Sequence, residues 1–299
     1  MQRRIHCYGI ILGLAVCLIS PVRAQESQRA ASTHHSLWKV EGQRNAVYLL
    51  GSVHVLKKEN YPLAAAIEAA FTNSSVVVFE TDVAALDDPG IAFKMMSKCR
   101  LPEGETLSQQ LSPEVYKQFT NHLSGSLMPA GMMEQFTPAF AAMTLVVLEM
   151  QKLGLEPEHG LDKHFFARAR KEEKQIVPLE TVDFQIDLLT EFTKAEGEPL
   201  MKATLKELET MKNDLADLLK AWETGDAKKL EKLMNEAMAD EPVIYKRLLT
   251  DRNRNWLPKI EEFLRGDKNT IVIVGAGHLV GKDGVVELLR KKGLKVTQQ

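Results

Sequence analysis

The sequence predicts an α/β (α+β) fold, in which a central, mostly parallel β-sheet has flanking helices and a large helical insertion. Continuous apolar runs such as Val76–Phe79 and residues 271–274 are typical of strands buried on both faces of a parallel sheet. A hairpin pattern comes first: Leu37–Glu41 alternates apolar and polar residues, and a polar turn leads into residues 46–50. Leucines at three- and four-residue spacings then indicate helices over most of residues 182–264. This order of elements predicts a single α/β domain.

The first 24 residues have the pattern of a signal peptide. Arg3 and Arg4 precede an apolar run over about residues 8–19, and Ala24 ends a small-residue cleavage site. The run is too short for a membrane span. We therefore expect export across a bacterial-type inner membrane and residence in the periplasm. Extracellular release is an alternative, and so is a lipid anchor on Cys17, although Val16 before it poorly matches the small residue expected there.

Signal cleavage leaves a leader over residues 25–36 and one expected domain over residues 37–299, with its helical insertion at about 91–265. The cleaved chain retains 35 Lys and Arg against 40 Asp and Glu. A nucleic-acid partner normally requires a basic face, so this acidic balance argues against one.

Stability must come from a large core, because Cys99 is the one cysteine left after cleavage and no internal disulfide can form. No integral membrane span is expected after cleavage. The apolar stretch 136–153 contains Pro138 and Glu149, which confine its uncharged part to about ten residues and favour a buried helix.

Four acidic or imidazole side chains follow apolar strands at the point where each strand ends. His54 and His278 each close a Gly-x-x-His unit, and Glu80 and Glu180 each follow a continuous apolar run. The carboxyl ends of parallel strands share one edge of a sheet, where ligand sites collect. The sequence therefore predicts one site that contains all four residues.

This set of side chains admits two kinds of chemistry. Two imidazoles with one or two carboxylates match the ligands of zinc, manganese or iron, and they equally match a general base with an orienting partner that activates water. Ser52 lies beside His54 but lacks the context of a serine nucleophile. Asp162 is expected either to cap its helix or to face the site, and His159 and His164 are expected to be surface or core histidines.

A dinucleotide site is excluded. The glycine run after residues 271–274 looks like a dinucleotide fingerprint, but that fingerprint needs a helix starting inside the run and a later strand ending in an acid. Here Asp283 is the expected N-cap of a delayed helix, and the next expected strand, Leu294 to Thr297, is followed by Gln298 and Gln299 and not by an acid.

Several motifs resemble those of the TraB/GumN family. They are Leu37-Trp-Lys-Val, Tyr48-Leu-Leu-Gly-Ser-Val-His54, Gly160-Leu-Asp162, Leu179-Glu-Thr181, Asp251-Arg-Asn-Arg254 and Val274-Gly-Ala-Gly-His-Leu-Val-Gly281. The resemblance runs from about residue 37 to 296, with the paired Gly-x-x-His units as its most specific part, and departs mildly at Asp251, where the family commonly has Glu. The family is similar to the Tiki metalloproteases, which use manganese or cobalt, and more distantly to erythromycin esterases and haem-associated ChaN proteins.

The resemblance implies that His54, Glu80 and His278 form the active-site set. The leading hypothesis is therefore a secreted, metal-dependent hydrolase that acts on peptide bonds. These three would hold a divalent ion (manganese, cobalt or zinc), and the general base would be Glu180, or Glu80 if it is not a ligand. Arg252 is expected to stabilise an oxyanion, to bind a substrate carboxylate or to form a structural ion pair. Two alternatives remain: a metal-independent esterase in which His and Glu activate water, and a non-catalytic protein that binds haem, a metal or a peptide. The expected partner is a peptide or small-molecule substrate.

Overall fold

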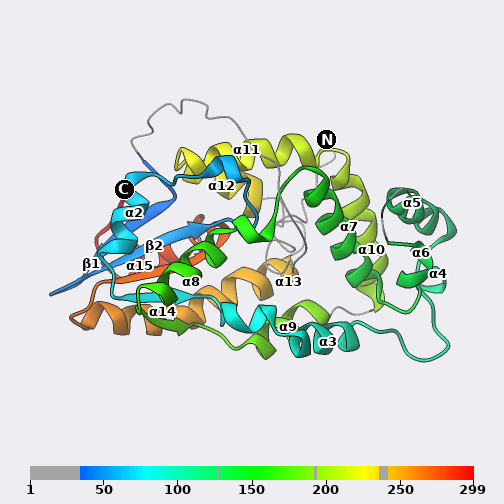
Figure 1. Ribbon diagram of the computed structural model, residues 1–299, viewed down its shortest axis with the longest axis horizontal. Helices are drawn as coiled ribbons and strands as arrows, with labels where there is room; N and C mark the ends of the chain where they lie inside the picture. Colours follow the sequence, from blue (N-terminus) through cyan, green and yellow to red (C-terminus); the bar gives the residue numbers. More distant parts are fainter. Residues whose placement is uncertain (1–33, 125, 127, 192–193, 236–241) are drawn as a thin grey trace.

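The computed structural model describes residues 34–124, 126, 128–191, 194–235 and 242–299. The expected signal peptide and most of the expected leader lie outside these residues. The described chain forms a six-stranded sheet with helices on its faces and a large helical region at one end (Figure 1).

The sheet has the order β4-β3-β5-β2-β1-β6. Strands β4, β3, β5 and β2 are parallel, whereas β1 is antiparallel to both β2 and β6. The strands are β1 (Leu37–Glu41), β2 (Ala46–Ser52), β3 (Val76–Phe79), β4 (Gln175–Pro178), β5 (Thr270–Gly275) and β6 (Val296–Gln298). The predicted α/β class with a mostly parallel sheet is confirmed.

Strand β5 is central because it is flanked by parallel strands on both sides. Ile273 pairs with Leu50 of β2 and with Phe79 of β3, and all three are almost fully buried. The continuous apolar runs in the sequence reflect this burial on both faces. The shared register also brings the carboxyl ends of these strands to one edge.

The connections place helices on both faces of the sheet. The helices are α2 (Ala65–Thr72), α3 (Pro89–Lys98), α4 (Leu107–Gln110), α5 (Pro113–Leu123), α6 (Ala130–Met133), α7 (Pro138–Lys152), α8 (Leu161–Lys171), α9 (Val182–Thr190), α10 (Lys194–Leu208), α11 (Met211–Glu223), α12 (Ala227–Leu230), α13 (Pro242–Tyr245), α14 (Asp251–Arg265) and α15 (Val285–Lys291). The crossovers between parallel strands contain α2 and α8, which pack on each other, and α14, which packs on α15 and β2. Phe71 of α2 stacks on Phe165 of α8, with ring centroids 4.8 Å apart.

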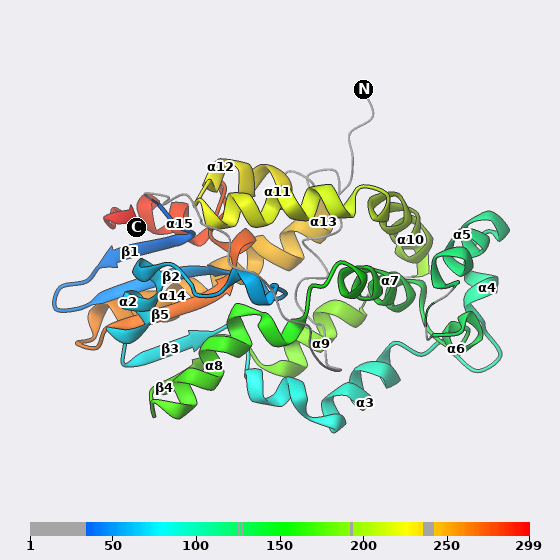
Figure 2. The same ribbon diagram turned by 45° about the horizontal axis from the view of Figure 1, so that its top comes forward.

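The helical region extends away from the sheet, with α4, α5 and α6 at its far end (Figures 1 and 2). Its central pair is α7 and α10, which pack side by side. The predicted buried helix is α7, and none of the described helices is long and apolar enough to cross a membrane. The chain returns from this region to add β4 to the sheet edge, so the inserted segment also contributes one strand.

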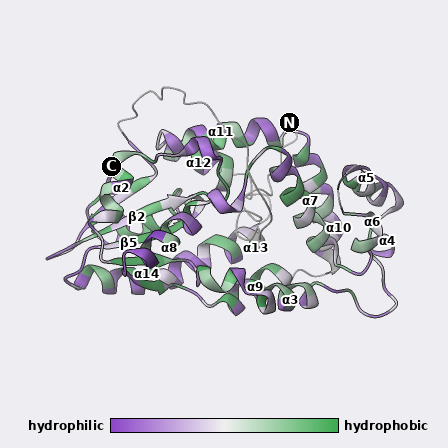
Figure 3. Cartoon of the chain, in the orientation of Figure 1, coloured by the Kyte–Doolittle hydropathy of each residue, from purple (hydrophilic) through white to green (hydrophobic). Residues whose placement is uncertain are grey.

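Helix α14 brings polar residues to the sheet without exposing its apolar side. Trp256, Ile260 and Leu264 pack inward, while charged residues alternate with them along the helix (Figure 3). Arg252 and Asn253, in its first turn, are also buried. These two polar residues need partners inside the protein.

One expected helix cap is wrong. The N-cap of α15 is Gly284, not Asp283, and it makes no side-chain capping bond. A tight turn, in which the Gly284 amide donates to the Gly281 carbonyl, shifts the helix start by one residue.

Candidate active site

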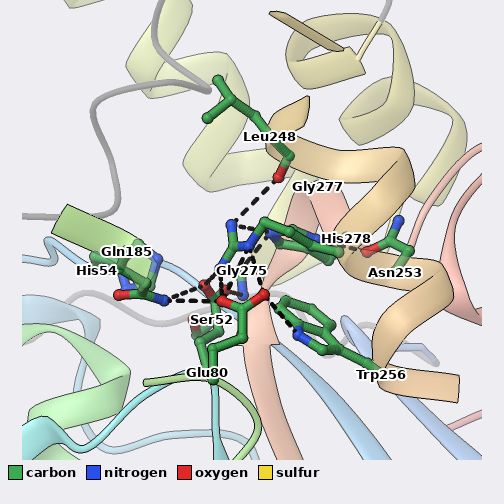
Figure 4. Close-up of polar contacts among 12 residues, drawn as sticks. Ser52, His54, Glu80, Gln185, Leu248, Asn253, Trp256, Gly275, Gly277 and His278 are labelled. Carbon is green, nitrogen blue, oxygen red and sulfur yellow. Dashed lines mark hydrogen bonds and ion pairs between the residues drawn. The ribbon is translucent and has the colours of Figure 1, made fainter. Parts of the chain in front are cut away.

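The side chains that follow β2, β3, β4 and β5 meet at the carboxyl edge of the sheet. His54 lies two residues after β2, Glu80 directly after β3, and Glu180 two residues after β4. His278 ends a single 3-10 turn, η7 (Ala276–His278), that follows β5. Figure 4 shows His54, Glu80 and His278 at this edge. Arg252 hydrogen-bonds to Glu80 and to His278.

The guanidinium of Arg252 is the hub of this cluster. Its Nε donates to both Glu180 carboxylate oxygens at 3.0 and 3.1 Å, and its Nη2 donates to Glu180 Oε2 at 2.8 Å and to Glu80 Oε2 at 2.5 Å. Its Nη1 donates to the Leu248 carbonyl at 3.2 Å and to His278 Nε2 at 3.1 Å. A guanidinium has five N–H groups. All five are used here, so Arg252 has no donor left for an oxyanion or a substrate carboxylate.

Glu80 is an ionised carboxylate held from two sides. Its Oε1 accepts a 2.7 Å hydrogen bond from the Gly275 amide, and its Oε2 accepts from Arg252. Burial alone would raise the pKa of Glu80, but the neighbouring Arg252 charge, the two site histidines and the Gly275 amide hold it well below its usual range. Glu80 is therefore a fixed negative charge and a weak base.

His278 is a neutral imidazole with both nitrogens engaged. Because Arg252 can only donate, His278 Nε2 is the acceptor, and Nδ1–H donates to Asn253 Oδ1 at 2.6 Å. Burial lowers the pKa of His278 to about 3, and the nearby Arg252 charge acts in the same direction. The Trp256 ring, 4.4 Å away between centroids, covers the imidazole. His278 therefore orients Arg252 and Asn253.

His54 forms a separate pair with Asp162. Its Nδ1 lies 2.7 Å from Asp162 Oδ2, and Ser52 donates to the other carboxylate oxygen at 3.2 Å. Burial would lower the pKa of His54, but the charge and hydrogen bond of Asp162 outweigh it and raise that pKa to about 9. The side chain of His54 is 22% exposed, against 6% for His278, so His54 is the histidine that solvent can reach.

A glycine explains why Asp162 reaches His54. A Cβ at Gly160 would lie 2.1 Å from the His54 carbonyl oxygen, so only glycine lets the start of α8 come this close to the turn after β2. Asp162 is the second residue of α8 and the N-cap is Gly160. Of the two roles expected for Asp162, the structure shows the one that faces the site.

A second glycine, Gly275, leaves space beside the reactive groups. A Cβ placed there would be 3.3 Å from Glu80 Oε1, 3.6 Å from His54 Nε2 and 3.6 Å from His278 Cδ2. His54 and Glu80 thus direct polar atoms at this space, whereas His278 presents a ring carbon. A water molecule or a substrate atom that approached Gly275 would meet both polar atoms.

The arrangement does not fit a metal centre built from His54, Glu80 and His278. The lone pair of His278 Nε2 and one oxygen of Glu80 are both engaged by a cation, Arg252. His278 Nε2 and Glu80 Oε1 are 3.8 Å apart, as expected for ligands of one ion, but the guanidinium blocks their use. Across the described part of the chain, no group of three or more His, Cys, Asp or Glu side chains has the geometry to hold a metal. The three-ligand set stays a prediction.

The remaining candidate site residues make contacts with residues outside the cluster. His159 is partly exposed and lies 3.4 Å from Glu156, and His164 packs between Tyr61 and Phe165. Cys99 is buried, which raises the pKa of its thiol to about 11 and makes it unreactive.

Sequence reasoning missed one residue of the cluster, Gln185. It lies in the first turns of α9, and its amide nitrogen is 3.4 Å from carboxylate oxygens of both Glu80 and Glu180. No motif marks it, because a glutamine in a helix after a strand is common. Trp256 donates to Glu180 Oε1 at 2.9 Å. Its place near the cluster could have been predicted, because it lies one helical turn after Arg252 and so on the same side of the helix.

The low pKa of His278 predicts that the folded protein loses stability in acid. Its pKa is about 3 when folded and about 6.5 in the unfolded chain, so the unfolded state binds more protons between these values. This stabilisation is complete above pH 6.5 and is lost as pH falls. We expect the urea midpoint to drop between pH 6.5 and 5, and to drop less in His278→Gln, which cannot titrate. Equal slopes for both proteins would contradict this assignment.

The fold and the site define a class: an α/β protein with a histidine–aspartate pair and an arginine–carboxylate cluster at the carboxyl edge of its parallel strands. Residues 36–298 match the TraB/PrgY/gumN family, and the chain belongs to that family.

Two kinds of relatives are similar to the chain. "Uncharacterized protein YbaP" of Escherichia coli (strain K12) is 25% identical over 81% of this chain and 87% of its own length. "Metalloprotease TIKI2" of Xenopus tropicalis is 24% identical over 87% of this chain and 59% of its own length. "Metalloprotease TIKI1" of Homo sapiens is 22% identical over 95% of this chain and 64% of its own length. The chain therefore spans about three fifths of the length of the Tiki relatives. No solved structure matches the chain.

Proposed function

We propose that this protein is a hydrolase whose reacting centre is His54, supported by Asp162 and Glu80. The observation that carries this proposal is the 2.7 Å contact between His54 Nδ1 and Asp162, which leaves Nε2 directed at the space beside Gly275. A histidine oriented through one nitrogen by a carboxylate, with its other nitrogen at an accessible space, is the arrangement of a general base.

In this proposal neutral His54 takes a proton from a water molecule through Nε2. Asp162 holds the Nδ1–H tautomer and stabilises the imidazolium that forms, which is the effect that raises the pKa of His54 to about 9. Glu80 stays ionised at the other side of the same space and orients the water through Oε1. The proton on His54 Nε2 then passes to the leaving group of the substrate.

A peptide bond is the proposed substrate bond, with an ester as the alternative. The Tiki relatives are named metalloproteases, which supports peptide cleavage. It also supports a metal-dependent form of the proposal, with manganese, cobalt or zinc. His54 Nε2 and Glu80 Oε1 are the protein donors that border the space beside Gly275. Two donors are fewer than the three that catalytic zinc sites usually have.

One experiment separates these forms. The protein, purified without a histidine tag, is assayed on a fluorogenic peptide mixture and an activated ester, before and after chelation, from pH 6 to 10. If neutral His54 is the base, turnover survives chelation and rises about tenfold per pH unit until it levels near pH 9. Loss on chelation with recovery on adding one metal would replace this form by the metal-dependent one. A rate that falls as pH rises through 9 would contradict a basic role for His54.

The proposed site of action is the periplasm, supported by the signal-peptide pattern of residues 1–24. Fractionation of cells that express the full chain tests this location. Retention in the cytoplasm without cleavage after Ala24 would contradict it.

A further inference from the structure

We propose that Arg252 is a built-in cation that occupies the position between Glu80, Glu180 and His278, and that it keeps these three side chains from binding a metal ion. The predicted metal centre of His54, Glu80 and His278 and the observed guanidinium compete for two of these three residues, Glu80 and His278. Arg252 therefore occupies the donor atoms of Glu80, Glu180 and His278 at the sheet edge. Of the two site histidines, His54 is the one open to a ligand.

The geometry of the contacts carries this inference. Arg252 Nη2 lies 2.5 Å from Glu80 Oε2 and 2.8 Å from Glu180 Oε2, and Nη1 lies 3.1 Å from His278 Nε2. Two carboxylate oxygens and one imidazole nitrogen thus converge on one charged group. A first-row metal ion would be bound by the same donors at about 2.0–2.2 Å, slightly closer than the guanidinium nitrogens. The guanidinium takes the place of such an ion.

The surroundings hold Arg252 in that place. Its side chain is 9% exposed, its guanidinium lies 4.9 Å from the Trp256 ring centroid, and the Leu248 carbonyl accepts from Nη1. Trp256 also donates to Glu180, so the partner carboxylate is itself fixed. For a metal to reach His278, Arg252 would have to give up its hydrogen bonds and remain as a second cation beside the ion. Both steps oppose metal binding in a buried site.

A measurable consequence is that any metal affinity of the natural protein is independent of His278. An ion could use His54 Nε2 and Glu80 Oε1, which border the space beside Gly275, without touching His278. Metal binding is measured without turnover, so the role of Arg252 can be tested whether or not the protein is a hydrolase.

The first test uses the natural protein and His278→Gln after removal of metals by a chelator. Zinc and manganese are titrated separately and followed by calorimetry, and the Nε2 resonance of His278 is followed by nitrogen NMR. We expect less than a twofold change in affinity between the two proteins, and no change at His278 Nε2 on metal addition. A tenfold or greater loss of affinity in His278→Gln would overturn the proposal, because it would make His278 a ligand.

The second test removes the guanidinium of Arg252. In Arg252→Ala the donors of Glu80, Glu180 and His278 face an empty cation position, so we expect zinc affinity to rise at least tenfold above that of the natural protein. The gain should disappear in the double variant with His278→Gln. The matched control is Arg290→Ala, which removes an exposed arginine 3.9 Å from Glu287 and should bind zinc as the natural protein does.

A well-folded Arg252→Ala that binds zinc no better than the natural protein would show that the guanidinium does not occupy a cation position. If this variant does not fold, Arg252→Met keeps most of the side-chain volume and is titrated instead. The comparison of the natural protein with His278→Gln decides the proposal in either case.

Discussion

His54→Ala is expected to lower turnover of the hydrolysed substrate by about 10²–10⁴-fold, the usual contribution of a positioned acid–base group. The loss should fall on kcat more than on KM, because His54 Nε2 faces the space for the reacting atom and not a binding surface. Stability near neutral pH should fall as well, because a pKa raised from about 6.5 to about 9 means that protonated His54 stabilises the folded chain. This contribution is lost as pH rises through 9, so kcat is compared at the plateau of the pH–rate profile. The matched control is His159→Ala, a partly exposed histidine paired with Glu156, which should keep full activity.

The companion variant Asp162→Asn tests how His54 acts. It removes the negative charge that raises the pKa of His54 while keeping a group of the same shape beside Nδ1. The plateau of the pH–rate profile should therefore move from near pH 9 towards lower pH, together with a lower kcat. A profile that stays at the same pH would mean that Asp162 does not set the pKa of His54. Turnover in His54→Ala within twofold of the natural rate would exclude His54 as the base.

The fold and the meeting of residues at the sheet edge were predictable because both follow from local pattern. The apolar runs of β3 and β5 specify parallel strands that are buried on both faces, and a parallel sheet has one carboxyl edge. His54, Glu80 and His278 follow such strands within three residues, so the backbone alone brings them together. The resemblance to the TraB/GumN family agrees with the family found for residues 36–298.

The roles inside the cluster were not predictable, because they depend on which atoms meet across the fold. Arg252 lies 72 positions from Glu180 and 172 from Glu80, and no spacing rule links them. The sequence makes His54 and His278 look equivalent, since both close a Gly-x-x-His unit. The structure separates them: Asp162 orients His54, whereas Asn253 and Arg252 use both nitrogens of His278.

The same separation explains the two opposite pKa shifts. His54 gains a carboxylate partner, so its pKa rises to about 9 despite burial. Burial lowers the pKa of His278 to about 3, and the neighbouring guanidinium acts in the same direction. A charge model based on the sequence alone would assign both imidazoles the same value near 6.5. Asp162 lies on α8 and Arg252 on α14, two helices far apart in the sequence, so only the tertiary fold decides which histidine is close to which charge.

Arg252→Ala is expected to cost about 3–5 kcal/mol of the free energy of unfolding in the presence of a chelator. The variant leaves the buried carboxylates of Glu80 and Glu180 without a counter-ion, and His278 Nε2 without its donor. Urea unfolding at pH 7 measures the loss. Arg290→Ala, the exposed control, should cost about 0–1 kcal/mol.

The pH dependence of this loss identifies its cause. In the natural protein the pKa of Glu80 is depressed, so the stabilisation from its ionised form is present above the unfolded value near 4.5 and disappears as pH falls. Without Arg252, burial and the neighbouring carboxylate favour the protonated form of Glu80, and acid relieves the repulsion. The stability difference between the natural protein and Arg252→Ala should therefore be largest near pH 7 and should shrink towards pH 4. A difference that stays constant over this range would assign the effect to lost packing against Trp256 and not to the unpaired carboxylates.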